Sequence, residues 1–212
     1  MILRNTAGQA TIRKFQIKTL EEVGEDIGEK SLIVFESPRD IAGTALLSHA
    51  GILDSDDQWL YLPALKRTKR ISSANKSGAF VGSEFSFEDF TLSELHKFRY
   101  VFVGQDKLDG VAVNIIDRIP LYAGSGYSRQ RAWLGEDDSQ LRRVEFYDPR
   151  DQLLKTLVLS EIRRDGSFLR AHRLLMTNHQ SRKETEIVYD AFNFGNGLDR
   201  NDFSVGILNQ IR

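Results

Sequence analysis

The sequence contains no cysteine, which excludes disulfides, thiolate zinc sites, iron–sulfur clusters and a cysteine nucleophile together. No Pro-rich or Ser-rich linker divides the chain, so we interpret residues 1–212 as a single domain. No apolar run approaches the roughly 18 residues that a membrane-spanning helix needs. The opening residues, MILRNTAGQATIRK, lack the apolar segment of a secretory signal and have instead the pattern of a strand, a turn and a second strand. A chain that begins within a hairpin indicates a longer precursor.

Excess charge of either sign is also missing. The 29 Lys and Arg residues nearly balance the 30 Asp and Glu residues, and the isoelectric point is about 6.4. A dedicated nucleic-acid-binding domain is usually strongly basic, so the composition speaks against a nucleic-acid partner. Hydrophobic residues make up 41% of the chain, which is enough for a folded core.

Catalytic and metal-binding motifs are scarce. The chain has no G-x-S-x-G elbow, no P-loop and no H-E-x-x-H. His172 and His179 are seven residues apart, which places them on opposite faces of a strand. The adjacent carboxylates Glu88 and Asp89 stand beside a predicted turn, where such pairs are usually solvated. We therefore expect neither an enzyme, nor a metal site, nor a cofactor.

Alternation of apolar and polar residues predicts a mainly β fold of antiparallel strands. The alternation predicts strands near 1–4, 10–20, 30–36, 41–49 and 59–65, about six more from residue 97 onward, and a final short strand at 203–208. Asp109-Gly110 and Asp165-Gly166 separate neighbouring strands and are strong hairpin signals. Such a sheet must close into a barrel, stack as two sheets or be covered.

The most suitable cover is the stretch 77–95, which lacks a clean strand pattern and is rich in phenylalanine. We predict that it forms a short helical or loop lid, and that Phe80, Val81, Phe85 and Phe87 belong to it. So many apolar groups do not fit a free surface loop. A double change of Phe85 and Phe87 to serine is then expected to weaken the binding of a fluorescent fatty acid with little loss of thermal stability.

Aromatic residues on the predicted strands are candidates for the wall of an apolar cavity under this lid. They are Trp59, Tyr61, Phe98, Tyr100 and Phe102. Whether Trp59 and Tyr61 or their neighbours face the cavity depends on a shift of one residue in register, which sequence does not decide.

A basic cluster, Lys66, Arg67, Lys69 and Arg70, lies between the aromatic strand and the lid. We expect it at the rim of the cavity, where the cations either meet anionic lipid headgroups or remain hydrated. A nucleic-acid site is disfavoured because the net charge is near zero and no binding signature surrounds the cluster.

Residues 57–90, DQWLYLPALKRTKRISSANKSGAFVGSEFSFEDF, resemble the signature of a bacterial family of outer-membrane lipoprotein-sorting proteins, relatives of the periplasmic carrier LolA. KSLIVFESPRDIAGTALLS (30–48) and AFNFGNGLDRNDFS (191–204) also resemble this family. The resemblance implies a Gram-negative precursor with a signal peptide and an N-terminal helix. It also implies an incomplete, strongly curved antiparallel β-barrel whose helical lid encloses an apolar cavity.

The function implied by the resemblance is a periplasmic carrier of lipoprotein acyl chains or another lipid towards the outer membrane. Transient membrane contact, an inner-membrane exporter and an outer-membrane acceptor are the implied partners. Two alternatives remain open from the residues themselves. One is a β-sandwich or lipocalin-like protein for a small apolar metabolite, and the other is an adaptor whose apolar face docks a membrane exporter.

Overall fold

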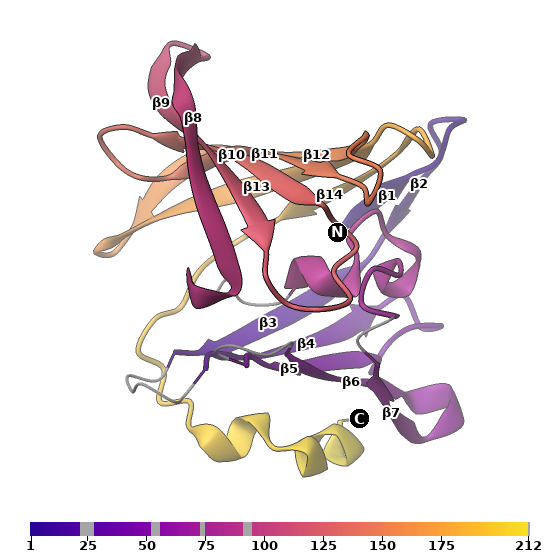
Figure 1. Cartoon of the computed structure of the whole chain (residues 1–212). Coiled ribbons are helices and arrows are strands. Elements are labelled where there is room, and N and C mark those ends of the chain that lie inside the picture. The colour runs from indigo at the N-terminus through magenta and orange to yellow at the C-terminus, as the bar shows by residue number, and fades with distance from the viewer. Residues whose placement is uncertain (22–27, 52–55, 73–74, 91–94, 212) are drawn as a thin grey trace.

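The computed structural model describes residues 1–211 apart from 22–27, 52–55, 73–74 and 91–94. Its strands form two antiparallel sheets that lie over one another as layers (Figure 1). The larger sheet has nine strands in the order β2-β1-β14-β13-β12-β11-β10-β9-β8, and the smaller has five in the order β3-β4-β5-β6-β7. In the described part of the chain neither sheet closes on itself, so the predicted open antiparallel β fold is confirmed.

Most strands lie near their predicted positions, but the strand predicted at 10–20 is divided into two, which belong to different sheets. The smaller sheet consists of β3 (Lys14–Leu20), β4 (Lys30–Ser37), β5 (Ala45–His49), β6 (Asp57–Leu62) and β7 (Arg67–Ile71). The larger sheet consists of β1 (Ile2–Arg4), β2 (Ala10–Ile12), β8 (Phe98–Leu108), β9 (Val111–Pro120), β10 (Arg129–Gly135), β11 (Leu141–Tyr147), β12 (Leu153–Asp165), β13 (Phe168–Asn178) and β14 (Lys183–Val188). Seven strands, β8 to β14, therefore occupy the region where the alternation predicts about six.

Turn chemistry explains the hairpins of the larger sheet. Asp109 and Gly110 both have positive φ, 49° and 85°, in the two-residue connection between β8 and β9. This is the backbone that a primed hairpin turn requires, and Asp-Gly adopts it readily. Between β12 and β13 the turn is Gly166-Ser167, one residue later than the Asp-Gly pair, because Asp165 ends β12 opposite Phe168; Gly166 has φ 60°.

Residues 77–90, which we call the cover segment, lie between the two layers (Figure 1). They contain two short 3-10 helices, η3 (Phe80–Gly82) and η4 (Phe87–Phe90), and η5 (Leu95–Lys97) precedes β8. Phe80 is completely buried in a cluster with Ile33, Phe35 and Leu46 of the smaller sheet. The remaining part of the predicted lid, residues 91–94, lies outside the described residues.

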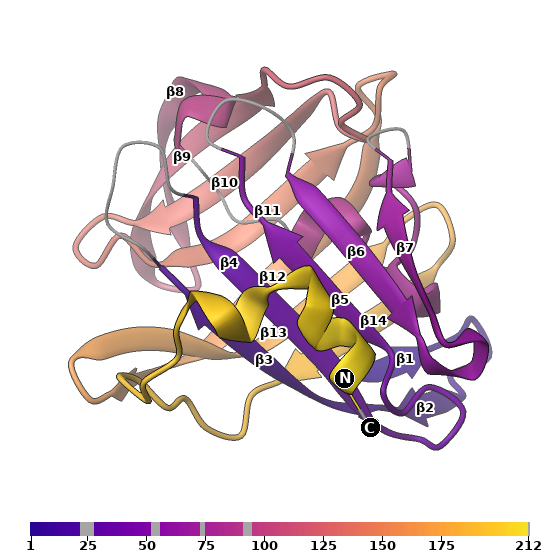
Figure 2. The same cartoon turned by 90° about the horizontal axis from the view of Figure 1, so that it is seen from below.

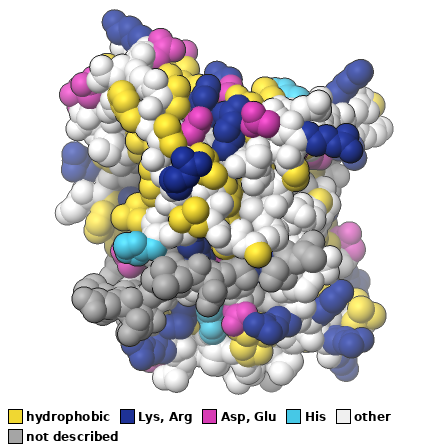
Figure 3. Space-filling model, in the orientation of Figure 1, with side chains coloured by type: hydrophobic (Ala, Val, Ile, Leu, Met, Phe, Trp, Pro, Cys, Tyr) yellow, Lys and Arg dark blue, Asp and Glu magenta, His cyan; other side chains and the backbone are white. Residues whose placement is uncertain are grey.

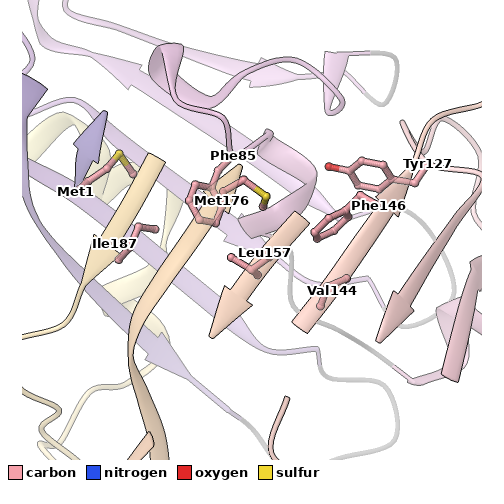
Figure 4. Close-up of a cluster of buried hydrophobic side chains, with 8 residues drawn as sticks. All are labelled: Met1, Phe85, Tyr127, Val144, Phe146, Leu157, Met176 and Ile187. Carbon is pink, nitrogen blue, oxygen red and sulfur yellow. The ribbon is translucent and has the colours of Figure 1, made fainter. Parts of the chain in front are cut away.

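Phe85 of the cover segment packs into a second cluster, on the larger sheet. Figure 4 shows its ring beside Met176, with the apolar side chains of the neighbouring strands pointing towards the segment. The cover segment thus carries one phenylalanine into the core of each layer. Because both phenylalanine rings are buried, the cover segment is part of the hydrophobic core. A loosely attached surface loop would leave both rings in water.

The predicted strand at 203–208 is wrong. The C-terminal region forms 3-10 helices, η6 (Arg200–Phe203) and η7 (Val205–Gln210), which lie across the outer face of the smaller sheet (Figure 2). Asp199 caps η6 because its side chain accepts a hydrogen bond from the backbone of Asn201. Phe203 of η6 and Leu208 of η7 are both fully buried against the sheet. No described helix is long and apolar enough to cross a membrane.

Candidate functional site

A cavity of about 210 Å³ lies between the cover segment and the concave face of the larger sheet. Phe85 and Phe90 line it from the cover segment. Apolar side chains line it from the sheet: Leu141, Val144, Phe146, Leu157, Leu174 and Ile187. The wall is therefore hydrocarbon on two sides.

Strand register makes this wall continuous. Val144 of β11 stands opposite Leu157 of β12, which in turn stands opposite Met176 of β13. Residues directly opposite in antiparallel strands share one face, so the three side chains form a row across the sheet. Leu174 stands opposite both Leu159 and Ile187 and forms a second row.

The other end of the cavity is polar and charged. Lys97, Arg118, Tyr122 and Gln130 line this end together with Glu88 of the cover segment. Arg118 donates a hydrogen bond to Gln130, and its guanidinium lies 4.8 Å from the centre of the Phe98 ring. The cavity therefore has an amphipathic lining.

Glu88 holds the cover segment to the loop that connects β9 with β10. Its Oε1 accepts a hydrogen bond from the hydroxyl of Tyr122 at 2.6 Å and another from Ser125. Its Oε2 accepts from the backbone N–H of Gly126 at 2.8 Å. A buried carboxylate is tolerated when such donors surround it, so the three bonds hold the segment in one place.

Asp89 makes a second buried attachment. Its Oδ1 accepts from the hydroxyl of Tyr127 at 2.7 Å, while its Oδ2 accepts from the backbone of Ser86 and pairs with the ammonium of Lys155. The side chains of Lys155 and Asp89 are only 4% and 5% exposed. A second buried ion pair, Lys97 with Asp56, lies at the start of β8.

These contacts perturb the tyrosines around the cavity. Burial, followed by the charge of Asp89, raises the pKa of Tyr127 well above 10, and burial followed by the charge of Glu88 raises that of Tyr122. Burial alone raises the pKa of Tyr189 to about 12. Each hydroxyl is therefore neutral in the folded protein at a pH where the unfolded chain already ionises.

A loss of stability in alkali follows from these raised pKa values. Stability is fully present below about pH 10 and is lost as the pH rises towards the folded pKa, by roughly 1.4 kcal/mol per pH unit for each tyrosine. Urea unfolding at several values between about pH 8 and pH 11.5 measures this slope. Tyr189→Phe removes one of the three groups and is expected to make the slope shallower by that amount. An unchanged slope would contradict the assignment for Tyr189.

The structure brings some of the predicted site residues together. Phe85 and Phe98 line the cavity. Phe80, Val81 and Phe87 are packed with the core of the smaller sheet. Tyr100 and Phe102 follow Phe98 along the same face of β8, but they lie progressively further out, with 40% and 64% of their surfaces exposed.

Trp59 and Tyr61 lie elsewhere. Tyr61 belongs to the cluster under the C-terminal helices with Phe203 and Leu208, and Trp59 packs against the same cluster. Leu60, between them, packs with the cluster that contains Phe80. The sequence left open which face of this strand points towards the cavity. In the structure Leu60 faces the cover segment, whereas Trp59 and Tyr61 face the C-terminal helices on the other side of the sheet.

The basic cluster does not line the cavity. Lys66 adopts a left-handed conformation (φ 46°) after the 3-10 turn η1 (Pro63–Leu65), and Arg67, Lys69 and Arg70 lie exposed on β7 at the edge of the smaller sheet. Arg70 forms an ion pair with Asp57 on the neighbouring strand. These cations therefore surround a hairpin at the margin of the molecule.

Sequence reasoning missed the polar attachments of the cover segment. The expectation that Glu88 and Asp89 are solvated is wrong, because both are buried against the larger sheet. One sequence signal was available: Lys155 interrupts the apolar strand Leu-Leu-Lys-Thr-Leu-Val-Leu. A cation in such a run is rarely buried without a partner, so it indicates a carboxylate nearby.

Comparisons with known proteins agree with this geometry. A family model described as an uncharacterized protein matches residues 28–210. A solved domain from Vibrio parahaemolyticus, named for outer membrane lipoprotein sorting, is 43% identical over 98% of this chain and 88% of its own, with a TM-score of 0.94. A DUF1329 family protein from Desulfovibrio piger is 29% identical over 98% of this chain and 88% of its own, with a TM-score of 0.90.

A LolA superfamily protein from Nitrosomonas europaea shares the fold at lower identity. It is 14% identical over 97% of this chain and 87% of its own, with a TM-score of 0.72. No curated protein matches the chain.

Proposed function

This chain belongs to the family of the outer membrane lipoprotein-sorting domain of Vibrio parahaemolyticus, and we propose that it is a LolA-like periplasmic carrier that shelters acyl chains between its cover segment and its larger sheet. The cargo is the acyl chains of a lipoprotein or another lipid, carried towards the outer membrane. The role is one of binding and transfer without catalysis. An inner-membrane exporter and an outer-membrane acceptor are the partners that such a carrier needs.

The observation that carries the proposal is the hydrocarbon wall of the cavity, which a separate segment of chain closes. Burial stabilises an acyl chain by about 0.8 kcal/mol per methylene, so a hydrocarbon wall is the surface that retains one. We propose a lipid as the ligand, and not a compact apolar metabolite, because the related domain is named for lipoprotein sorting.

The size of the cavity implies movement. Ligand sites usually enclose about 300–1,000 Å³, whereas this cavity has about 210 Å³. A whole acyl chain therefore requires the cover segment to move away from the larger sheet. In this sense we assign the cover segment, residues 77–90, as the lid.

Membrane contact is assigned to the hairpin between β6 and β7. Leu65 is 68% exposed at its tip, next to Lys66 and Arg67. An exposed leucine beside cations suits the headgroup region of an anionic membrane, where each cation near the surface contributes about 1 kcal/mol.

Native mass spectrometry of the protein purified from a Gram-negative periplasm tests the proposal directly. We expect a bound species with the mass of a diacyl or triacyl lipid, released on unfolding. A bound compact metabolite would support the small-ligand alternative instead. Failure of any lipid to bind, together with co-purification of a membrane exporter, would support the adaptor role.

A matched pair of substitutions on β13 tests the position of the site. Leu174 lines the cavity, and Leu175 points to the opposite face of the strand. Leu174→Trp is expected to fill the space of about two methylenes and to weaken fluorescent fatty acid binding on the order of tenfold. Leu175→Trp adds the same volume outside and should bind as the wild type does. Equal binding by both variants would move the site elsewhere.

A further inference from the structure

Strand β8 (Phe98–Leu108) is an open edge of the larger sheet. Within the described ranges it pairs with β9 alone. Four consecutive large apolar residues, Tyr100 to Val103, lie on this edge with 40%, 39%, 64% and 44% of their surfaces exposed. Figure 3 shows apolar side chains along this side of the molecule. A long apolar edge strand tends to pair with another chain unless charges, a bulge or another segment cover it. The exposed edge of β8 is therefore suited to pairing with a further strand.

A bulge determines which residues of β8 share a face. The register with β9 shifts between Phe102 and Gly104. Before the shift Arg99 stands opposite Ile119, and after it Asp106 stands opposite Val113. Ile119 and Val113 are an even number of residues apart on β9, so Arg99 and Asp106 project from the same face of the sheet.

This arrangement makes β8 complementary to itself. When two copies run antiparallel about a two-fold axis between Phe102 and Val103, Arg99 of each copy stands opposite Asp106 of the other. Both residues are exposed, and neither forms an ion pair within the described part of its own chain. A shift of one residue either way would place Arg99 opposite Gln105 or Lys107 and would lose the charge match.

We propose that β8 is a dimerisation edge that pairs with β8 of a second copy of this chain in this register. The apolar residues Tyr100 to Val103 form the centre of the contact, and two Arg99–Asp106 pairs flank it. An apolar centre with a charged rim is the usual anatomy of a protein interface. The two nine-stranded sheets then join edge to edge, and each edge covers the other. This inference is independent of the cargo.

Sedimentation equilibrium of the purified chain and three variants tests the pairing. The wild type is expected to form a concentration-dependent dimer at micromolar concentrations. Arg99→Asp turns both flanking pairs repulsive and should weaken the dimer on the order of tenfold or more. The double change Arg99→Asp with Asp106→Arg restores opposite charges and should restore the dimer.

Lys107→Asp is the matched control. It alters the net charge by the same amount as Arg99→Asp, on the same strand, but Lys107 stands opposite Phe98 in the proposed register. We expect little effect on the dimer. A monomeric wild type, equal weakening by both single changes, or failure of the double change to restore the dimer would each overturn the proposal.

Discussion

Asp89→Asn is expected to destabilise the protein by about 3–5 kcal/mol, because it leaves the ammonium of Lys155 buried without a countercharge. The side chains of Lys155 and Asp89 are among the least exposed charged groups of the described chain, with 4% and 5% of their surfaces exposed. Lys155 retains the carbonyl of Glu84 at 3.2 Å and the faces of Tyr127 and Phe146, but none of these carries a full negative charge. The expected fall in the thermal midpoint is about 6–20 °C for a chain of this length.

Two further variants separate the buried charge from other causes. Asp89→Asn combined with Lys155→Met removes both charges and is expected to recover most of the loss, since a buried pair is often replaced by apolar groups at little cost. Asp57→Asn removes the carboxylate partner of Arg70 on the surface, where 45% of the Asp57 side chain is exposed, and should cost at most about 1 kcal/mol. Equal losses for Asp57→Asn and Asp89→Asn would refute the argument from burial.

The position of this pair also bears on cargo release. Asp89 belongs to the cover segment and Lys155 to β12, so any movement of the segment away from the larger sheet separates them. Glu88 and its three donors would be separated at the same time. Opening therefore exchanges buried polar contacts for water and apolar contacts for acyl chain, which is how a carrier can combine retention with release.

Strand positions were predictable because local chemistry determines them. Asp109-Gly110 forms a tight turn and Gly166 begins another, and alternation then assigns the flanking strands. The C-terminal strand prediction failed because a short apolar spacing is ambiguous. Phe203 and Leu208 suit a strand by composition, but two short 3-10 helices bury them, and Asp199 caps the first of these helices.

The cover segment illustrates a different limit of sequence reasoning. Its phenylalanines identified it as a cover, but their number says nothing of how deeply each is buried. Phe85 is 3% exposed within the cluster of Figure 4, so the expectation that serine there leaves thermal stability nearly unchanged is corrected. Similarly, the charges of Glu88 and Asp89 predicted solvation, whereas their tyrosine donors, Tyr122 and Tyr127, are 34 and 38 positions away in the sequence.

Phe80→Ala is the second substitution with a large expected effect, a loss of about 3–5 kcal/mol in the free energy of unfolding. The Phe80 ring is fully buried and contacts the rings of Phe35, Phe87 and Phe90, at centroid distances of 5.7, 5.5 and 4.8 Å. Alanine leaves a cavity that these three rings cannot close without leaving their own contacts. Chemical denaturation measures the loss.

Phe102→Ala provides the control, since it makes the same chemical change at a ring that is 64% exposed. Its expected cost is within about 0.5 kcal/mol at protein concentrations where the chain is monomeric. The difference in stability loss between Phe80→Ala and Phe102→Ala tests whether the cover segment is part of the hydrophobic core or a loosely attached surface loop. Because Phe80 attaches the segment to the smaller sheet and does not line the cavity, the proposed opening would leave that attachment in place. A loss below about 1 kcal/mol for Phe80→Ala would contradict this and make the whole segment a loose flap.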